Sequence, residues 1–300
     1  MIKLFNINNY IVDTSKFENV LHGSVVDEFE KAFAEYVGAK YACSANSASS
    51  LLYLSMVQYK KATISLPSTI PIVVPNIIVN TDNYISFHDD TSWVGHSYNL
   101  HDNIYDSAQE VTKNQFKNHK YNDLLIFSFY PTKPVGSCDG GMVVSNNKST
   151  IDWFKTMTMN GTTKQSDSWK RLHTKPGYKM HCSSLQAYIG LQNLRKLDDK
   201  QRIIDEIRET YNDKLGYNNT SRHLYRIKVN NNKPFINHMV SRGIQCGIHY
   251  EHCHEKQFYT DGHKVSLPES KCESTTTVSI PLHEKLTTSD INKVIENAQT

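Results

Sequence analysis

Apolar residues recur along the chain with spacings typical of helices and strands. Residues 25–37 carry apolar residues at steps of three or four, including Phe29, Phe33 and Val37, which places them on one helical face. Gly38 follows at the position where glycine commonly ends a helix. The pattern therefore predicts a helix over residues 25–37 with one buried face.

Short apolar runs rich in β-branched and aromatic residues predict strands. These runs are residues 41–43, 63–66, 84–87, 103–106, 124–129 and 142–145. Helical patterns stand between several of them, and one such pattern follows the small polar run from Ser44 to Ser50. Alternating strands and helices indicate an α/β sheet.

The second half of the chain begins with helical patterns and continues with shorter elements. A pattern over residues 184–197 leads into a charged helical stretch, residues 200–215, which we expect to link two domains. We therefore predict a large α/β domain over residues 1–200 and a smaller α+β domain over residues 201–300. The patterns of the smaller domain predict strands at 224–229, 247–251 and 276–282, and a last helix at 288–298 capped by Thr288 or Ser289.

Composition and charge are those of an ordinary globular protein. The 300 residues are 38% hydrophobic, and 33 basic and 30 acidic residues are scattered to a net charge of +3, without the basic cluster typical of nucleic-acid binding. The six cysteines form no CxxC pair, so we interpret them as reduced thiols. No signal peptide is recognisable and no segment approaches 18 uninterrupted apolar residues, so we expect a cytoplasmic protein without membrane insertion.

Lys133 lies between two apolar runs, in the segment "IFSFYPTKPVGSCDGGMVV". Most lysines are solvated surface groups, and that is one interpretation of this residue. The other is a Schiff-base lysine, whose amine becomes nucleophilic by desolvation and condenses with an aldehyde. The neighbouring sequence has to decide between them.

Two further features point to one cofactor. Asp106 ends an apolar strand, where ligands bind in α/β sheets, although it could equally cap a helix. The run from Ser44 to Ser50 suits a phosphate at a helix N-terminus, or a plain N-cap. Pyridoxal phosphate (PLP) needs a lysine for its aldehyde, a carboxylate for its pyridine nitrogen and a helix N-terminus for its phosphate.

Several segments in this order resemble the DegT-type sugar aminotransferases, a family of PLP enzymes of fold type I. They are "SANSASSLLYLSM", "IYDSAQEV", "FSFYPTKPVGSCDGGMVVSN", "PGYKMHCSSLQAYIGLQNLRKLD", "GIQCGIHYEHCHEKQFY" and "VSIPLHEKLTTSDINKVIENA". The similarity runs from about Val25 to Ala298. It implies a large α/β/α domain with a mainly parallel sheet and a smaller C-terminal α+β domain.

The resemblance also implies roles for individual residues. Lys133 would form the imine with PLP, and Asp106 would pair with the pyridinium nitrogen. Gln109 would hydrogen-bond the phenolic oxygen of PLP. The phosphate would be held by Ser47, the Ala48 amide and the Ser128 hydroxyl. Lys179 would contact the phosphate bound in the partner subunit. His181, His249 and His254 would lie on the substrate side.

The chain departs from the family pattern at four places. Lys179 stands where the family has an asparagine, and His181 stands where it has a basic residue. Pro71 takes the place of an aromatic residue that stacks on the cofactor ring. The segment between Asp89 and Asn103 is shorter than usual.

The segment around His252 has enough histidines to suggest a metal site. Three histidines and a cysteine lie within six residues, from His249 to His254. In the resembled family this segment is a substrate-side loop, and two of the histidines fall on its histidines. We therefore expect no metal there.

The resemblance implies an aminotransferase that works as a homodimer. Its donor would be glutamate, and its acceptor would be a nucleotide-linked keto sugar aminated at C4 or C3. Two alternatives stay open: a PLP-dependent sugar dehydratase of the same fold, in which a histidine replaces the lysine, and a cofactor-free relative that binds nucleotide sugars.

Overall fold

The chain forms two compact units. The computed structural model describes residues 1–8, 10–163, 168–260, 262 and 265–299. One unit, here called the sheet unit, comprises Asn8–Lys60 and Ser97–Arg195. The other, here called the terminal unit, comprises Met1–Ile7, Lys61–His96 and Lys196–Thr300.

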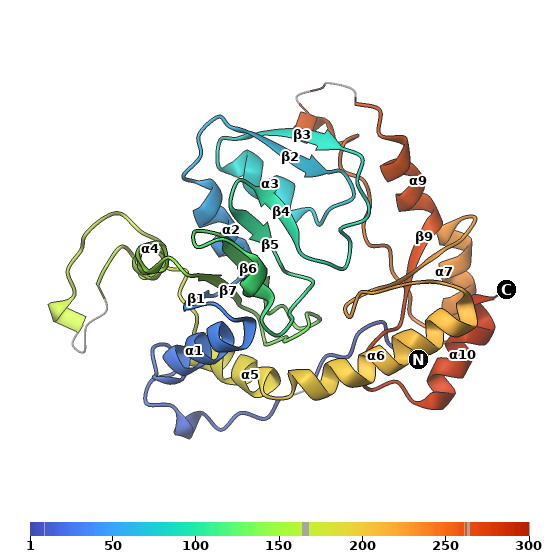
Figure 1. The fold of residues 1–300 in the computed structure, drawn as a ribbon, viewed down its shortest axis with the longest axis horizontal. Coiled ribbons are helices and arrows are strands. Elements are labelled where there is room, and N and C mark those ends of the chain that lie inside the picture. Colours follow the sequence, from blue (N-terminus) through green and yellow to red (C-terminus); the bar gives the residue numbers. More distant parts are fainter. Residues whose placement is uncertain (9, 164–167, 261, 263–264, 300) are drawn as a thin grey trace. The chain divides into compact units, whose positions relative to one another are not determined.

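A five-stranded sheet forms the centre of the sheet unit, in the order β1-β7-β6-β5-β4 (Figure 1). Its strands are β1 (Tyr41–Ala45), β4 (Tyr98–His101), β5 (Ile104–Asp106), β6 (Leu124–Ser128) and β7 (Gly141–Ser145). Among the neighbouring strands of this described sheet, only β5 and β6 run parallel. The sheet is therefore mixed, whereas the expectation was a mainly parallel sheet. The connections explain the difference, because β4 joins β5 through a tight turn and β6 joins β7 without a crossover helix.

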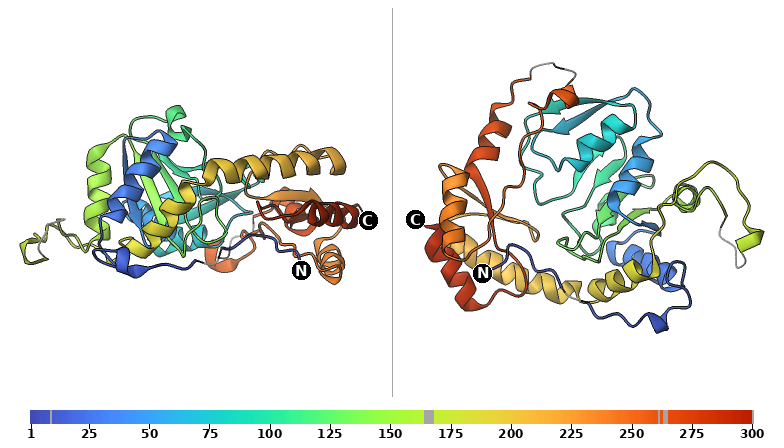
Figure 2. Two further views of the ribbon diagram at one scale, coloured as in Figure 1. Left: turned by 90° about the horizontal axis from the view of Figure 1, so that it is seen from below. Right: turned by 180° about the vertical axis from the view of Figure 1, so that it is seen from behind.

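Helices cover this sheet and confirm the predicted α/β class. They are α1 (Val25–Val37), α2 (Ala48–Met56), α4 (Lys148–Thr158) and α5 (Ser184–Leu194), with the short 3-10 helices η1 (Thr14–Lys16), η2 (Gln115–Asn118) and η3 (Ser168–Lys170). α1 packs against α5 and β1, whereas α2 packs against β6 and β7 (Figures 1 and 2). The helix predicted over residues 25–37 is confirmed, and Gly38 ends it with a φ of 79°.

Aromatic side chains fill the space between α1 and the sheet. Phe29 and Phe33 of α1 are fully buried against Phe127 and Phe129. Their ring centroids lie 4.9–6.1 Å apart, the spacing at which aromatic pairs attract. This cluster fixes α1 against the strand that leads to Lys133.

The terminal unit contains two small sheets. β2 (Thr63–Pro67), α3 (Val73–Asn80) and β3 (Tyr84–His88) form a strand-helix-strand unit with parallel strands, and β8 (Tyr225–Lys228) pairs antiparallel with β9 (Thr277–Ile280). The remaining helices are α6 (Leu197–Leu215), α7 (Asn232–Ser241), α8 (Gln257–Thr260), α9 (Pro268–Thr276) and α10 (Thr288–Ala298). α6 packs beside α10 (Figure 2), and buried apolar side chains of α6, β8, β9 and α10 form one core.

Two details of the C-terminal prediction are wrong. Residues 247–251 form no strand in the described chain beyond a single bridge between Gly247 and Ser279. The last helix is capped by Thr287, whose hydroxyl and N–H both donate to the Asp290 carboxylate while the hydroxyl accepts from the Asp290 N–H. The capping residue therefore lies one residue earlier than expected, whereas the helix spans the predicted residues 288–298. The division of the chain into domains at residue 200 stays a prediction.

Two broader features concern the thiols and the helices. All six cysteines are free. Among the helices of the described residues, none combines the length and the apolar character needed to cross a bilayer.

Candidate active site

Asp106 lies at the carboxyl end of β5, between β6 and β4 in the sheet unit. Only 6% of the residue is exposed. Its Oδ1 accepts a hydrogen bond from the Ala108 N–H at 2.9 Å, and its Oδ2 accepts one from the Tyr98 hydroxyl at 3.1 Å. Burial raises the pKa of Asp106, whereas the Ala108 N–H, the charge of Lys133 and the Tyr98 hydroxyl lower it.

Lys133 lies in the turn that follows β6, and its N–H donates to the Tyr130 carbonyl at 2.8 Å. The turn depends on Gly136, which has a φ of 60° and approaches the Pro131 carbonyl so closely that a Cβ would lie 2.9 Å from its oxygen. Burial lowers the pKa of the Lys133 amine to about 8, against a smaller opposing effect of the Asp106 charge. The structure thus brings Lys133 and Asp106 into one electrostatic site, with a lysine that is partly neutral near pH 8.

The serine-rich turn lies next to the ends of β6 and β7. Ser47 caps α2 by accepting the Ser50 N–H at 3.1 Å, and Ala48 is the first residue of the helix. Gly141 of β7 pairs with Ser128 on one side and with Ala45 on the other. A Cβ on Gly141 would lie 2.5 Å from the Ala48 nitrogen, so only glycine permits this approach of the strand to the helix.

The same arrangement gathers hydroxyl and N–H groups at the start of a helix. N–H groups of the first helical turn have no partner within the helix, and the helix dipole favours an anion there. Ser47 and Ala48 lie at this point, and Ser128 lies across Gly141 from them. These residues can therefore bind a phosphate.

Gln109 lies in the loop directly after Asp106 and is 3% exposed. The loop is closed by a hydrogen bond from the Glu110 N–H to the Ser107 carbonyl at 3.2 Å. Gln109 thus lies buried three residues after Asp106, and its contact with the cofactor stays a prediction.

Lys179 and His181 lie beside the turn that carries Ser47. His181 pairs with Ala45, and the Asn46 N–H donates to the Met180 carbonyl at 2.8 Å. The Lys179 side chain is exposed. The His181 ring lies against the His22 ring at an interplanar angle of 37°, with ring centroids 4.4 Å apart. Burial lowers the pKa of His181, as do the nearby charges of His22, Lys179 and Arg171.

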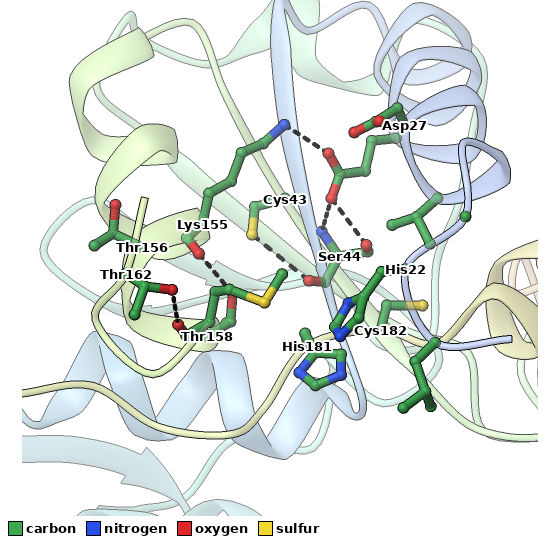
Figure 3. A pocket seen from close by; sticks show the side chains of 15 residues that line it. His22, Asp27, Cys43, Ser44, Lys155, Thr156, Thr158, Thr162, His181 and Cys182 are labelled. Atoms are coloured by element: carbon green, nitrogen blue, oxygen red, sulfur yellow. Dashed lines mark hydrogen bonds and ion pairs between the residues drawn. The ribbon is translucent and has the colours of Figure 1, made fainter. Parts of the chain in front are cut away.

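A cavity of about 120 Å³ lies next to these two histidines (Figure 3). Its polar wall is built around Glu30, which accepts from the Ser44 N–H and hydroxyl at 2.8 and 2.9 Å and pairs with Lys155 at 2.6 Å. Among the described residues that line it, neither Lys133 nor Asp106 is found. We therefore do not place the expected imine-forming reaction of Lys133 in this cavity.

His249 and His254 lie in the terminal unit, whereas the other predicted site residues lie in the sheet unit. His249 Nδ1 shares a hydrogen bond of 2.9 Å with the Ser279 hydroxyl. His254 is 3% exposed, and its Nδ1 shares one of 2.6 Å with the Ser68 hydroxyl. Pro71 also belongs to the terminal unit, where its carbonyl accepts the Val74 N–H before α3.

The described ranges of the chain contain no group of three or more His, Cys, Asp or Glu side chains that could hold a metal ion.

Tyr98 is the residue of this site that the sequence analysis missed. It stands directly opposite Asp106 in the antiparallel pair of β4 and β5. The signal that could have revealed it is the short polar turn around Asp102, which has a φ of 47° and joins two runs that alternate in polarity. A hairpin at this turn places Tyr98 beside Asp106.

The described sheet unit thus holds a buried carboxylate, a lysine of lowered pKa and a helix start near one another, and the comparison with known families agrees. The DegT/DnrJ/EryC1/StrS aminotransferase family matches residues 5–88 and 104–299. The chain belongs to this family. The expected resemblance to DegT-type sugar aminotransferases is thereby confirmed, and the internal gap of the family match, residues 89–103, falls in the segment that the sequence showed to be short.

Individual relatives of the DegT/DnrJ/EryC1/StrS family cover nearly all of the chain. The UDP-4-amino-4,6-dideoxy-N-acetyl-beta-L-altrosamine transaminase of Campylobacter jejuni is 26% identical over 92% of this chain and 89% of its own length. The aminotransferase TlmJ of Streptoalloteichus hindustanus has the same fold, with a TM-score of 0.85, 20% identity and coverage of 99% and 98% of the two chains. A Streptococcus pneumoniae protein solved in its PLP form has a TM-score of 0.80, 16% identity and coverage of 97% and 96%. The fold expected of fold type I enzymes is therefore confirmed.

Proposed function

We propose that this member of the DegT/DnrJ/EryC1/StrS family uses PLP to transfer an amino group from glutamate to a nucleotide-linked keto-deoxysugar, at C4 or C3. The observation that carries the proposal is the pair formed by Lys133 and Asp106, in which each group acts on the pKa of the other. The Campylobacter jejuni relative, named as a transaminase of a UDP-linked sugar, supports the substrate class.

The residues of the sheet unit fit PLP. A buried carboxylate, an amine of lowered pKa and hydroxyls at a helix start match the pyridine nitrogen, the aldehyde and the phosphate of that cofactor. Gly141 adds a steric argument, because any side chain there would fill the space beside the Ala48 nitrogen. When bound, PLP supplies an aldehyde that condenses with amines and a ring that accepts electrons.

Lys133 and Asp106 divide the acid-base work of the proposed reaction. With a pKa of about 8, the Lys133 amine can take a proton from the α-carbon of the donor and return one to the acceptor carbon. The ionised form of Asp106 would hold a proton on the pyridine nitrogen, which would keep the ring able to accept electrons. Removal of either side chain is expected to abolish transfer.

The remaining residues bind and orient. Ser47, the Ala48 amide and Ser128 hold the phosphate, and Gln109 donates to the phenolic oxygen of PLP. We propose a homodimer in which Lys179 serves the phosphate of the neighbouring site. His181, His249 and His254 are assigned to the substrate side.

The test is incubation of the protein with PLP, glutamate and a panel of nucleotide-linked keto sugars, read by mass spectrometry. We expect one sugar to gain an amino group, and we expect the visible absorption of the PLP-loaded protein to be bleached by borohydride. Near-normal transfer by Lys133→Ala would refute the role of the lysine. A protein that stays colourless with PLP would favour a cofactor-free binder of nucleotide sugars.

A further inference from the structure

We propose that Tyr98 is a positioning residue that keeps the Asp106 carboxylate ionised and oriented toward the cofactor nitrogen, an inference that rests on the proposed function. The contact behind it is the hydrogen bond of 3.1 Å from the Tyr98 hydroxyl to Asp106 Oδ2. Tyr98 and Asp106 are cross-strand partners, so their side chains stand on the same face of the sheet. The backbone itself thus sets this pair.

The start of β4 is fixed to the loop that carries Gln109. The Ser97 N–H donates to Glu110 Oε2 at 2.9 Å, and the Ser97 hydroxyl shares a hydrogen bond of 2.6 Å with the Ser107 hydroxyl. Ser97 directly precedes Tyr98, and Ser107 and Glu110 follow Asp106 by one and four residues. The tyrosine is therefore fixed at the open end of the hairpin, where β4 begins and β5 ends.

The carboxylate needs donors because it is buried. Burial by itself favours the protonated acid, which could not keep a proton on a pyridine nitrogen. The groups that face it are the Ala108 N–H after β5, the Lys133 amine after β6 and the Tyr98 hydroxyl on β4. Tyr98 and Ala108 bind different oxygens, so each oxygen has one donor and keeps a lone pair for the cofactor.

Tyr98 lies within residues 89–103, the stretch of the chain that the family match leaves uncovered. The inferred role is therefore tied to the short segment of this chain and to the hairpin built from it. It does not follow from the family match, which begins again at Ile104.

The first test measures the titration of Asp106 in the cofactor-free protein. Aspartate is isotope-labelled at its carboxyl carbon, and the NMR signal is assigned with Asp106→Asn. We expect Tyr98→Phe to raise the pKa of Asp106 by about one unit, because a hydrogen bond to a charged group favours the ionised form by that order. An unchanged titration of Asp106 in a folded Tyr98→Phe protein would overturn the proposal.

Tyr105→Phe is the matched control. Tyr105 precedes Asp106 on the same strand, so its side chain points to the opposite face, where it contacts His119. Its loss is expected to leave the titration of Asp106 unchanged. An equal shift in Tyr105→Phe would show that any loss of a tyrosine near β5 has this effect, and would also overturn the assignment to Tyr98.

A second measurement covers the case in which Tyr98→Phe does not fold. Fluorotyrosine at position 98 keeps the shape of the side chain and is a more acidic donor, so it is expected to lower the pKa of Asp106. In the PLP-loaded protein, Tyr98→Phe is expected to weaken PLP binding about tenfold, because a change of one pKa unit has the same free energy as a tenfold change in affinity. If the unaltered protein binds no PLP, the proposed function fails, while the titration of the cofactor-free protein still decides the role of Tyr98.

Discussion

At the scale of single residues, burial acts in opposite directions on the two ionisable groups of the site. It lowers the pKa of Lys133 to about 8 and raises that of Asp106, while the attraction between the charged forms counters both changes. The attraction between Lys133 and Asp106 therefore opposes the loss of charge that burial favours at both groups. The charge of each group thus depends on the other residue.

This dependence predicts the effect of Asp106→Asn on Lys133. Loss of the negative charge removes the attraction that favours the ammonium, so the pKa of Lys133 should fall below its value of about 8. Competitive labelling of amines across a pH series, read at Lys133 by mass spectrometry, measures this shift in the cofactor-free protein. Asp139→Asn is the control, because Asp139 accepts only the Gly140 N–H in the described contacts of its side chain. A labelling midpoint that does not move, or one near the ordinary lysine value of 10.5, would contradict the coupling.

Sequence patterns placed Lys133 in a turn and Asp106 at a strand end, and the resemblance to the DegT-type sugar aminotransferases implied their roles. The sequence could not identify Tyr98, since its role depends on which residue of β4 stands opposite Asp106. Register of this kind is fixed by the turn at Asp102 and by packing, and not by the residue type alone. The same limit explains why the contact between His22 and His181 was not predicted.

At the scale of elements, the proposed phosphate site requires the close approach of β7 to α2. Gly141→Ala would place a Cβ 2.5 Å from the Ala48 nitrogen and 2.8 Å from the Ser47 carbonyl carbon, and backbone atoms cannot move away cheaply. We expect a loss of about 1–3 kcal/mol in the free energy of unfolding, typical of overpacking. We also expect a reduced ratio of the affinities for PLP and pyridoxal, since these ligands differ only in the phosphate.

Gly190→Ala is the matched control for this prediction. A Cβ there would lie 2.6 Å from the Phe29 ring, so this variant also overpacks the sheet unit, at the contact between α5 and α1. Its stability should fall by a similar amount while the ratio of the two affinities stays unchanged. If both variants change that ratio equally, the start of α2 is not the phosphate site.

Element positions were predicted better than element directions. The helix at residues 25–37 and the strand positions from β1 to β7 follow from periodicity and turn residues, except for β4, which the sequence analysis did not contain. Periodicity has no information on strand direction, so the antiparallel pairs of the sheet were not foreseen. The segment at 247–251 alternates like a strand, but in the described chain it contacts β9 through the single bridge of Gly247 with Ser279.

At the scale of the whole molecule, the order of the chain does not follow the order of its compact units. Residues 61–96 precede most strands of the sheet unit but belong to the terminal unit with residues from Lys196 onward. Membership of a unit is decided by contacts between distant residues, which a local pattern does not record. Near the unit boundary at Lys196, the sequence predicted two helical patterns that meet between residues 197 and 200, whereas α6 begins at Leu197.

Assembly of two copies gives the last prediction. If Lys179 serves the phosphate of the neighbouring site in a homodimer, then Lys133→Ala and Lys179→Glu damage the same site from different subunits. Each variant alone should be inactive. A dimer formed from one copy of each has one site with both changes and one site with neither, so an equal mixture should recover about a quarter of the normal activity after subunit exchange.

The control for the charge reversal is Lys175→Glu, because Lys175 is also exposed and lies four residues before Lys179. Lys175→Glu should be active without mixing with another variant. This result would show that the effect of Lys179→Glu depends on the position of the new negative charge and not on its sign alone. Light scattering on every sample establishes that the dimers form. Full activity of Lys179→Glu alone, or no recovery in mixed dimers, would place Lys179 outside the site. A fully active monomer would remove the shared site altogether, and the phosphate would then depend on the helix start and hydroxyls of a single sheet unit.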